Sequence, residues 1–414
     1  MGFSKWFSKR LGLRKNVTAS TSTGVVIAVA GVALALVVME LSLAVSAGFK
    51  HQIERKVLGF DAPITVFPPY NYETASMQGE MQLSDTLRSI IEETLPGARP
   101  VESLRRHAIL KTDSDFIAVE CFAYGKDHDR SFENEILVRG TITNSDDSIV
   151  ISSTMARKLG LDTASRAYLY YFIDGKPKVR RASISGIYNS NFGEYDNSVI
   201  YTSLPLLQGL ADDSTAIGSV AVEGLKFENL NQIEEESQKL QSALVEKYRE
   251  GEITNMHMVG NIGGNAAVFF NWLDLLDTNV VVIFILMACV AGFTLISSLF
   301  IIILDRVATI GILRSLGASK GQVSRIFVNV ALRIVGLGMI IGNVIALSVI
   351  ALQNHTHFLP LDPDMYYLDS VPFELSWVAW LALNVGVAAG AWLILILPAR
   401  LAARIDPSSS MRYE

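Results

Sequence analysis

The sequence predicts a membrane protein with four transmembrane α-helices and one large extracytoplasmic α+β domain between the first and second helices. Half of the 414 residues are apolar and only 18% are charged, whereas soluble domains carry about a quarter charged residues. The apolar residues gather near the N-terminus and in the last third of the chain. The middle of the chain has the composition of a soluble domain.

Four apolar stretches are long enough to cross about 30 Å of hydrocarbon as helices, which takes about 20 residues. They cover residues 24–45, 278–304, 326–352 and 375–397. Basic residues precede the first stretch, as in a signal peptide. However, its apolar run is longer than the ~7–15 residues of a signal-peptide core, so we interpret it as a retained helix.

The basic residues predict the orientation. Lysine and arginine occur in residues 1–23, 305–325 and 398–414, but none lies between Arg333 and Arg400. The positive-inside rule therefore places those three segments, including both termini, in the cytoplasm. The domain at 46–277 and the loop at 353–374 are expected outside.

The domain at 46–277 alternates strand-like and helix-like segments, and stalk helices at about 49–59 and 266–277 are expected to continue the first two spans out of the membrane. Strands are expected at 64–67, 116–122, 148–151, 166–173, 178–187 and 199–201. Asp174-Gly175 is a hairpin turn signal. Helices are expected after Ser84, before Gly160, at 204–210 and at 230–248. We expect two subdomains, the second (about 117–215) inserted in the first.

Sequence motifs of common enzymes are absent: there is no phosphate-binding P-loop, zinc-protease, hydrolase-elbow or dinucleotide motif. We interpret the glycine-rich residues 260–264 as a flexible connector. The histidines at 355 and 357 beside acidic residues are interpreted as solvated rather than metal-binding. A net charge of −6 with no basic face argues against nucleic acid as a partner. The sequence thus predicts no catalytic site, metal or cofactor in this chain.

The cytoplasmic segment 305–325 contains a short amphipathic helix. Ile310, Leu313 and Leu316 are its apolar residues, Arg306 and Arg314 flank them, and a glycine follows at the capping position. From these residues alone, the helix either lies on the lipid headgroups or docks on a partner.

Residues 310–319, IGILRSLGAS, resemble the cytoplasmic coupling loop of FtsX-like permeases. This ABC transporter superfamily also includes MacB and the lipoprotein-releasing LolC/LolE permeases. Residues 41–50 (LSLAVSAGFK), 361–377 (LDPDMYYLDSVPFELSW) and 398–414 (PARLAARIDPSSSMRYE) resemble LolC/LolE segments in the same order. The resemblance is closest to the LolC/LolE type. It implies a multi-pass protein of a bacterial inner membrane, with a MacB/LolC-like periplasmic core as its outer domain.

The resemblance also implies a function: a permease subunit that extracts lipoproteins from the inner membrane for delivery to the outer membrane. A LolD-like ABC ATPase would bind ATP and Mg and drive the cycle. A second permease copy or paralogue, the lipoprotein cargo and the lipid bilayer would be the other partners. The residues implied to couple to the ATPase are Ile310, Gly311, Leu313, Arg314, Leu316, Gly317 and Ala318.

Two features depart from the family pattern. Many relatives have an acidic residue just before the Ile-Gly of the coupling helix, where this chain has Thr309. In the subunit that grips the periplasmic carrier, a long hook protrudes from a hairpin, and the turn at 173–178 is too short to hold one. A periplasmic carrier therefore stays an open partner, docked by this chain or by its partner subunit.

A lipid cavity is expected between the first two spans. The residues expected to line it are Leu36, Glu40, Leu41, Val45, Val290, Phe293 and Leu299. Small residues in the first span leave room for a ligand, although they also favour tight helix packing. Glu40 either reaches the outer headgroups or faces this cavity.

Two other functions stay open. One is mechanotransmission, as in a MacB-like or FtsX-like permease that moves no substrate through itself. The other is a membrane-anchored binding or sensor module without an ATPase, which failure to co-purify with any ATPase would favour.

Overall fold

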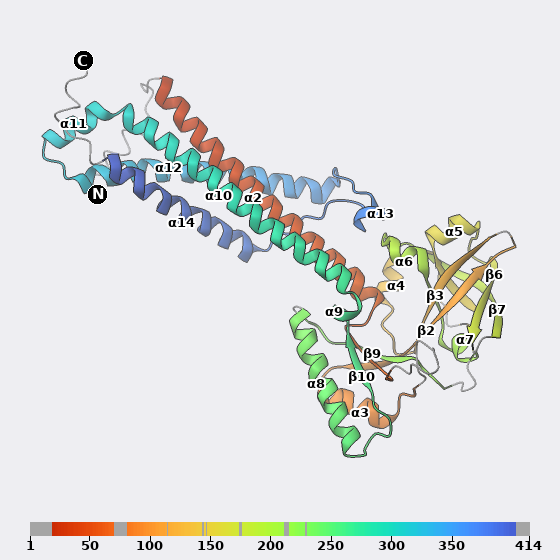
Figure 1. The fold of residues 1–414 in the computed structure, drawn as a ribbon. Helices are drawn as coiled ribbons and strands as arrows, with labels where there is room; N and C mark the ends of the chain where they lie inside the picture. Colours follow the sequence, from red (N-terminus) through yellow and green to blue (C-terminus); the bar gives the residue numbers. More distant parts are fainter. Residues whose placement is uncertain are drawn as a thin grey trace. The chain divides into compact units, whose positions relative to one another are not determined.

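The computed structural model describes residues 19–69, 81–113, 115–142, 145, 147–173, 176–210, 215–227 and 230–402. They form two compact units, whose fold is drawn in Figure 1. The membrane unit takes in residues up to His51, Leu273–Pro360 and residues from Ser370 onward. The outer unit takes in Gln52–Trp272 and Leu361–Asp369. Most of the two predicted cytoplasmic ends, at 1–18 and 403–414, lies outside the described residues.

Four long helices dominate the membrane unit. They are α2 (Ala19–Phe60), α10 (Ala267–Leu304), α12 (Lys320–Thr356) and α14 (Trp377–Ala402). Each is long and apolar enough to cross a membrane, which confirms the four predicted transmembrane helices. α2 continues from its predicted span, which ends at 45, to Phe60, and α10 begins 11 residues before its predicted span, so the two helices cover the stalk segments expected at about 49–59 and 266–277. Both therefore continue from one unit into the other as unbroken helices.

Glycines let α2 and α12 pack closely. A Cβ added at Gly338 would lie 2.9 Å from the Cβ of Val32, and one at Gly342 would lie 3.0 Å from the carbonyl oxygen of Ala33. Such contact between backbones is typical of helix association in lipid, where packing replaces the hydrophobic effect. α12 begins with a capping box, in which Ser319 and Gln322 each bond the backbone N–H of the other.

A closed ring of six strands forms one part of the outer unit. The strands are β2 (Arg99–Lys111), β3 (Phe116–Tyr124), β8 (Val199–Ser203), β5 (Ser148–Ser152), β7 (Lys176–Tyr188) and β6 (Arg166–Ile173). Each pairs with the next in that order, and β6 pairs back to β2. Alternate residues such as Ala167, Leu169 and Tyr171 are at most 1% exposed, so the ring encloses an apolar core.

Short elements surround this ring. They are α4 (Ser131–Ile136), β4 (Leu137–Gly140), α5 (Ser153–Leu159), α6 (Gly193–Ser198) and α7 (Leu204–Gln208). Gly160 ends α5 with a φ of +63°, the left-handed conformation in which glycine has no steric cost.

The rest of the outer unit is a sheet extension with two helices. β9 (Ser219–Glu223), β1 (Ile64–Phe67) and β10 (Met258–Asn261) continue from the first half of β2. The helices are α3 (Asp85–Thr94) and α8 (Leu230–Arg249), and the one-turn helices α9 (Ile262–Asn265) and α13 (Pro363–Tyr366) also belong to this unit. Ser84 caps α3 as predicted, and the apolar faces of α3 and α8 are buried.

Comparison with the sequence predictions shows that four strands were not predicted: β2, β4, β9 and β10. The predicted strands at 64–67 and 166–173 coincide with β1 and β6, and the other four fall within β3, β5, β7 and β8. β2 was not predicted, yet it belongs to both parts of the outer unit, so the ring begins before residue 117. Residues 260–264 are not a flexible connector, because they complete β10 and form α9. The predicted turn at 174–175 lies outside the described residues.

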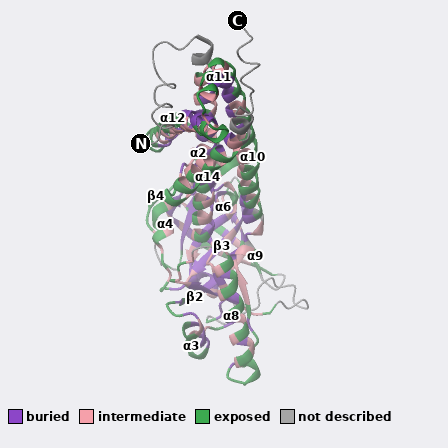
Figure 2. Cartoon of the chain, turned by 90° about the vertical axis from the view of Figure 1, so that its left-hand side faces the viewer, coloured by how far each residue is buried: buried purple, intermediate pink, exposed green. Residues whose placement is uncertain are grey.

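Burial differs between the two units. Figure 2 shows buried residues concentrated in the strands, whereas much of α10 is exposed and α11 (Val307–Ser315) has both buried and exposed residues. Among the 18 most apolar consecutive residues of α10, and likewise of α14, only 11% are buried inside the protein. Helices that are apolar on every side but unburied in their own chain are typical of membrane spans.

Candidate functional site

An apolar cavity of about 210 Å³ lies between α2, α10 and α14 in the membrane unit. Four residues of α2 form one wall: Val32, Ala35, Leu36 and Met39. The other lining residues are Phe284, Ala288, Ala291, Gly292 and Leu295 of α10 and Leu383, Gly386, Val387, Gly390, Ala391 and Ile394 of α14. All the lining side chains are apolar, and about half of the lining positions are glycine or alanine. Short side chains therefore create this space, and its chemistry suits hydrocarbon.

The structure places the predicted cavity residues in different surroundings. Leu36 lines the cavity, whereas Leu41 and Val45 pack in a cluster with Ile350 and Phe373. On α10, the remaining predicted residues also lie elsewhere: Val290 is 48% exposed, Phe293 is 72% exposed, and Leu299 is buried in the bundle core. The reason is the helical period. The open face of α2 carries positions 32, 35, 36 and 39, and positions 41 and 45 have turned toward α12.

The structure places Glu40 in neither of its two expected positions. Its side chain is fully buried, so it neither reaches the headgroups nor lines the cavity beside α10. Asn384 on α14 donates to its Oε1 (3.1 Å) and also to Asn343 Oδ1 on α12 (3.2 Å). Asn343 donates back to Asn384 Oδ1 at 2.8 Å. This polar network joins three helices at a depth where unpaired polar groups are costly.

The cytoplasmic helix α11 divides the predicted coupling residues into two sets. Ile310 is 1% exposed and belongs with Gly311 to the buried side, so these two are unavailable to a partner. Leu316 is 79% exposed, and Ile312, which the prediction omitted, is 59% exposed one turn earlier. Leu313, Arg314 and Ala318 are half-buried. Gly317 ends the helix with a φ of +88°. Ile312 and Leu316 are therefore the most exposed large apolar side chains of this segment.

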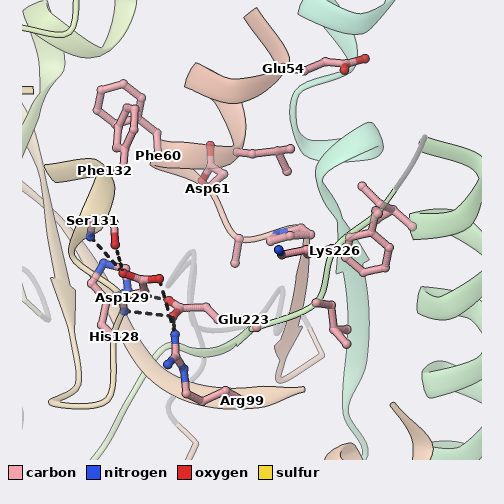
Figure 3. Close-up of a pocket in the computed structure, with 18 of the residues that line it drawn as sticks. Glu54, Phe60, Asp61, Arg99, His128, Asp129, Ser131, Phe132, Glu223 and Lys226 are labelled. Carbon is pink, nitrogen blue, oxygen red and sulfur yellow. Dashed lines mark hydrogen bonds and ion pairs between the residues drawn. The ribbon is translucent and has the colours of Figure 1, made fainter. Parts of the chain in front are cut away.

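The outer unit contains a second cavity of about 550 Å³, with mixed polar and aromatic walls (Figure 3). His128 lies at its edge between two carboxylates: Nδ1 is 2.5 Å from Glu223 Oε1, and Nε2 is 2.6 Å from Glu133 Oε1. Burial alone would lower the pKa of His128. The hydrogen bonds and negative charges of the two carboxylates outweigh burial and raise this pKa to about 9. At neutral pH, His128 is therefore positively charged and links the two carboxylates; this arrangement is called the histidine clamp.

The last turn of α2 is fixed in the same region. Asp61, which follows α2, accepts from Arg105 Nη2 of β2 at 2.5 Å and from the Tyr195 hydroxyl at 2.7 Å. Phe60 stacks on Tyr195 with ring centroids 4.1 Å apart. It also meets Phe132 edge-on at 5.0 Å (Figure 3). The end of α2 is thus held rigidly within the outer unit. Sequence reasoning missed this anchor because its residues are far apart along the chain.

Neither region has the composition of a metal centre. Among the residues that the structure describes, no group of three or more histidine, cysteine, aspartate or glutamate side chains is arranged to hold a metal ion. His51 pairs instead with Glu374, through Nδ1 at 2.8 Å.

Comparisons with known proteins found three kinds of similarity. Residues 281–407 match the family described as FtsX-like permease C-terminal. The chain is 23% identical over 405 residues to the lipoprotein-releasing system transmembrane protein LolC of Xylella fastidiosa, covering 93% of this chain and 92% of that one. It is 30% identical over 146 residues to LolE of Haemophilus influenzae, covering 33% and 35%. Among solved structures, the periplasmic region of MacB from Actinobacillus actinomycetemcomitans covers 50% of this chain and 92% of its own, at 12% identity and a TM-score of 0.33.

Proposed function

We propose that this chain, a multi-pass ABC transporter permease with an FtsX-like C-terminal domain, extracts lipoproteins from the inner membrane for delivery to the outer membrane. The observation that carries the proposal is the apolar cavity between α2, α10 and α14. Extraction exposes acyl chains to water at a cost of about 0.8 kcal/mol per CH₂. A lipoprotein extractor therefore needs an apolar surface that shelters those chains.

The energy would come from a LolD-like ATPase that binds ATP and Mg. Its contact on this chain would be Ile312 and Leu316, two exposed apolar side chains one turn apart on α11. Ile310 and Gly311 on the opposite side are packed in the bundle core, so a push on α11 would reach the spans directly. A second permease copy or paralogue would complete the complex.

Photo-crosslinking tests the cargo. A crosslinker at Met39 or Val387, which line the cavity, should capture lipoprotein in membranes without ATP, and the adduct should fade once ATP and the ATPase are supplied. Phe293 is the matched control, because it lies on α10 but outside the cavity. Equal capture at the cavity and control positions, unchanged by ATP, would refute a lipoprotein site here.

The same proposal requires both termini and α11 in the cytoplasm. Single cysteines at Ser324, Ser153 and Asp364, in a chain lacking Cys121 and Cys289, test this orientation. An impermeant thiol reagent should label intact cells at 153 and 364 only. Labelling at 324 would contradict the predicted orientation.

Mechanotransmission is the second candidate function, and one observation favours it. α2 and α10 run unbroken from the membrane unit into the outer unit, so movement of the spans would be transmitted outward even without a transported substrate. ATP-driven movement of the outer unit in a complex that never captures lipoprotein would support this function over extraction.

A further inference from the structure

The loop between α12 and α14 contributes a segment to the outer unit. This segment, Leu361–Asp369, is here called the latch. Its two ends meet: the N–H of Leu361 donates to the carbonyl of Asp369 at 2.8 Å, and the flanking Pro360 and Ser370 form an antiparallel bridge. The latch is therefore a closed loop that α12 and α14 hold covalently from either side.

Lys56 of α2 binds the latch through its ammonium group. Its Nζ donates to the carbonyl oxygen of Tyr367 at 2.7 Å and to that of Asn191 at 3.4 Å. The side chain of Asn191 in turn donates to Asp369. One lysine thus connects the latch, the end of α2 and the connection between β7 and α6.

Tyr367 is held in an unusual backbone conformation. Its φ is +61°, a region that bulky residues rarely adopt unless surrounding contacts impose it. Its ring meets Phe192 edge-on at 4.7 Å and Phe269 of α10 at 5.8 Å. These aromatic contacts and the Lys56 hydrogen bond are the contacts that impose it. The latch therefore has one defined seat, formed by α2, α10 and the connection between β7 and α6.

We infer that the latch is a further mechanical connection between the spans and the outer unit, with Lys56 and Tyr367 as its positioning residues. The chain passes between the units four times: within α2, within α10, and at the two ends of the latch. Without the latch contacts, only α2 and α10 would carry movement outward. Seated, the latch makes α12 and α14 move with the outer unit. This inference rests on the proposed function, since an ATPase must drive the spans.

The test opens the latch by substitution and closes it again with a chemical crosslink. The variant Lys56→Cys/Asp369→Cys, in a chain lacking Cys121 and Cys289, removes both polar anchors of the latch. A short bis-methanethiosulfonate crosslinker then restores the connection, and a reductant reverses it. The control Lys50→Cys/Asp277→Cys removes another lysine–aspartate pair (3.2 Å) that joins α2 to α10 without involving the latch.

Two readouts are measured in the complete complex in nanodiscs: ATP hydrolysis with lipoprotein transfer, and the distance between ketone-linked spin labels at Lys158 and Leu352. Opening the latch should reduce transfer by roughly tenfold, a typical size for coupling between sites, while hydrolysis stays within about twofold. The label distance should broaden. Crosslinking should restore both the transfer and the label distance. The control variant should change neither the transfer nor the label distance.

Three results would overturn the inference: an unchanged label distance in the open variant, equal loss of hydrolysis and transfer, or blocked transfer after crosslinking. The last would mean that the latch must open during the cycle. If the unmodified complex transfers no lipoprotein, the proposed cargo fails, and the label distance still decides whether the latch connects the units.

Discussion

Filling the apolar cavity should block cargo extraction without disturbing the fold. Gly390 of α14 lines the cavity, and a Cβ added there meets no atom within 4 Å. Gly390→Leu therefore places its side chain in open space. Gly336 of α12 is the matched control, because a Cβ there also meets nothing within 4 Å but the position lies outside the cavity.

The magnitude follows from the carbon atoms displaced. A leucine side chain occupies the space of about four CH₂ groups, and each acyl CH₂ left unsheltered costs about 0.8 kcal/mol. The extracted state should lose at most about 3 kcal/mol, which is roughly two orders of magnitude in its population. Both variants gain about 1 kcal/mol of helix propensity over glycine, so this effect cancels in the comparison.

The assay is ATP-dependent transfer of a fluorescent lipoprotein from nanodiscs that contain the complete complex. Gly390→Leu should reduce transfer strongly, Gly336→Leu should leave it near wild type, and both should hydrolyse ATP normally. Equal transfer by the two variants would show that the cavity does not shelter the cargo, and the reasoning would be refuted.

Three other predictions concern the α11 face, the histidine clamp and the buried network. Leu316→Asp should place an unpaired charge in the ATPase contact, which weakens that contact by about 3 kcal/mol and abolishes coupled hydrolysis. Leu316→Met should retain coupled hydrolysis. Normal coupling in the aspartate variant would mean that α11 is a surface helix. His128 has a raised pKa, so its contribution to stability is complete below its ordinary pKa of 6.5 and is lost as the pH rises through about 9. Thermal unfolding of the full chain should show this decline, and His128→Gln should flatten it; an unchanged decline in that variant would show that another group causes it. Asn384→Leu should destabilise the bundle by about 1–3 kcal/mol, because it removes the hydrogen-bond donor of the buried Glu40. Glu40→Leu/Asn384→Leu should regain most of that loss when unfolding is measured in bicelles. An unchanged stability of the single variant would mean that the network contributes nothing.

Local patterns predicted the elements well. The strand at 64–67 and the helix after Ser84 were recognisable because side-chain alternation, helical period and capping are properties of neighbouring residues. β2 was missed because its sequence includes Arg105, Arg106 and His107. Arg105 is only partly exposed in the structure because Asp61, 44 positions earlier, pairs with it. A strand whose charges are neutralised by distant partners has no local signature.

The candidate site was predicted less well, since it depends on which way each helix faces. Apolarity in the first span gave no preference between the face of Leu36 and that of Val45, because both faces are apolar. Leu36 and Val45 are nine residues apart, about two and a half helical turns, so one faces the cavity and the other faces a packed cluster on the opposite side of the helix. The asparagines at 343 and 384 were visible as polar residues within spans, and they were the available signal that Glu40 is buried in a network.

The sequence alone determined the number of spans, their expected orientation and the α+β content of the outer domain, because hydropathy, charge and short-range period act along the chain. The tertiary structure decided which residues meet: Lys56 and Tyr367 across 311 positions, His128 and Glu223 across 95, and Glu40 and Asn384 across 344. Such contacts depend on how helices rotate and strands close into a ring. That outcome is set by packing among all the elements at once, so no single segment encodes it.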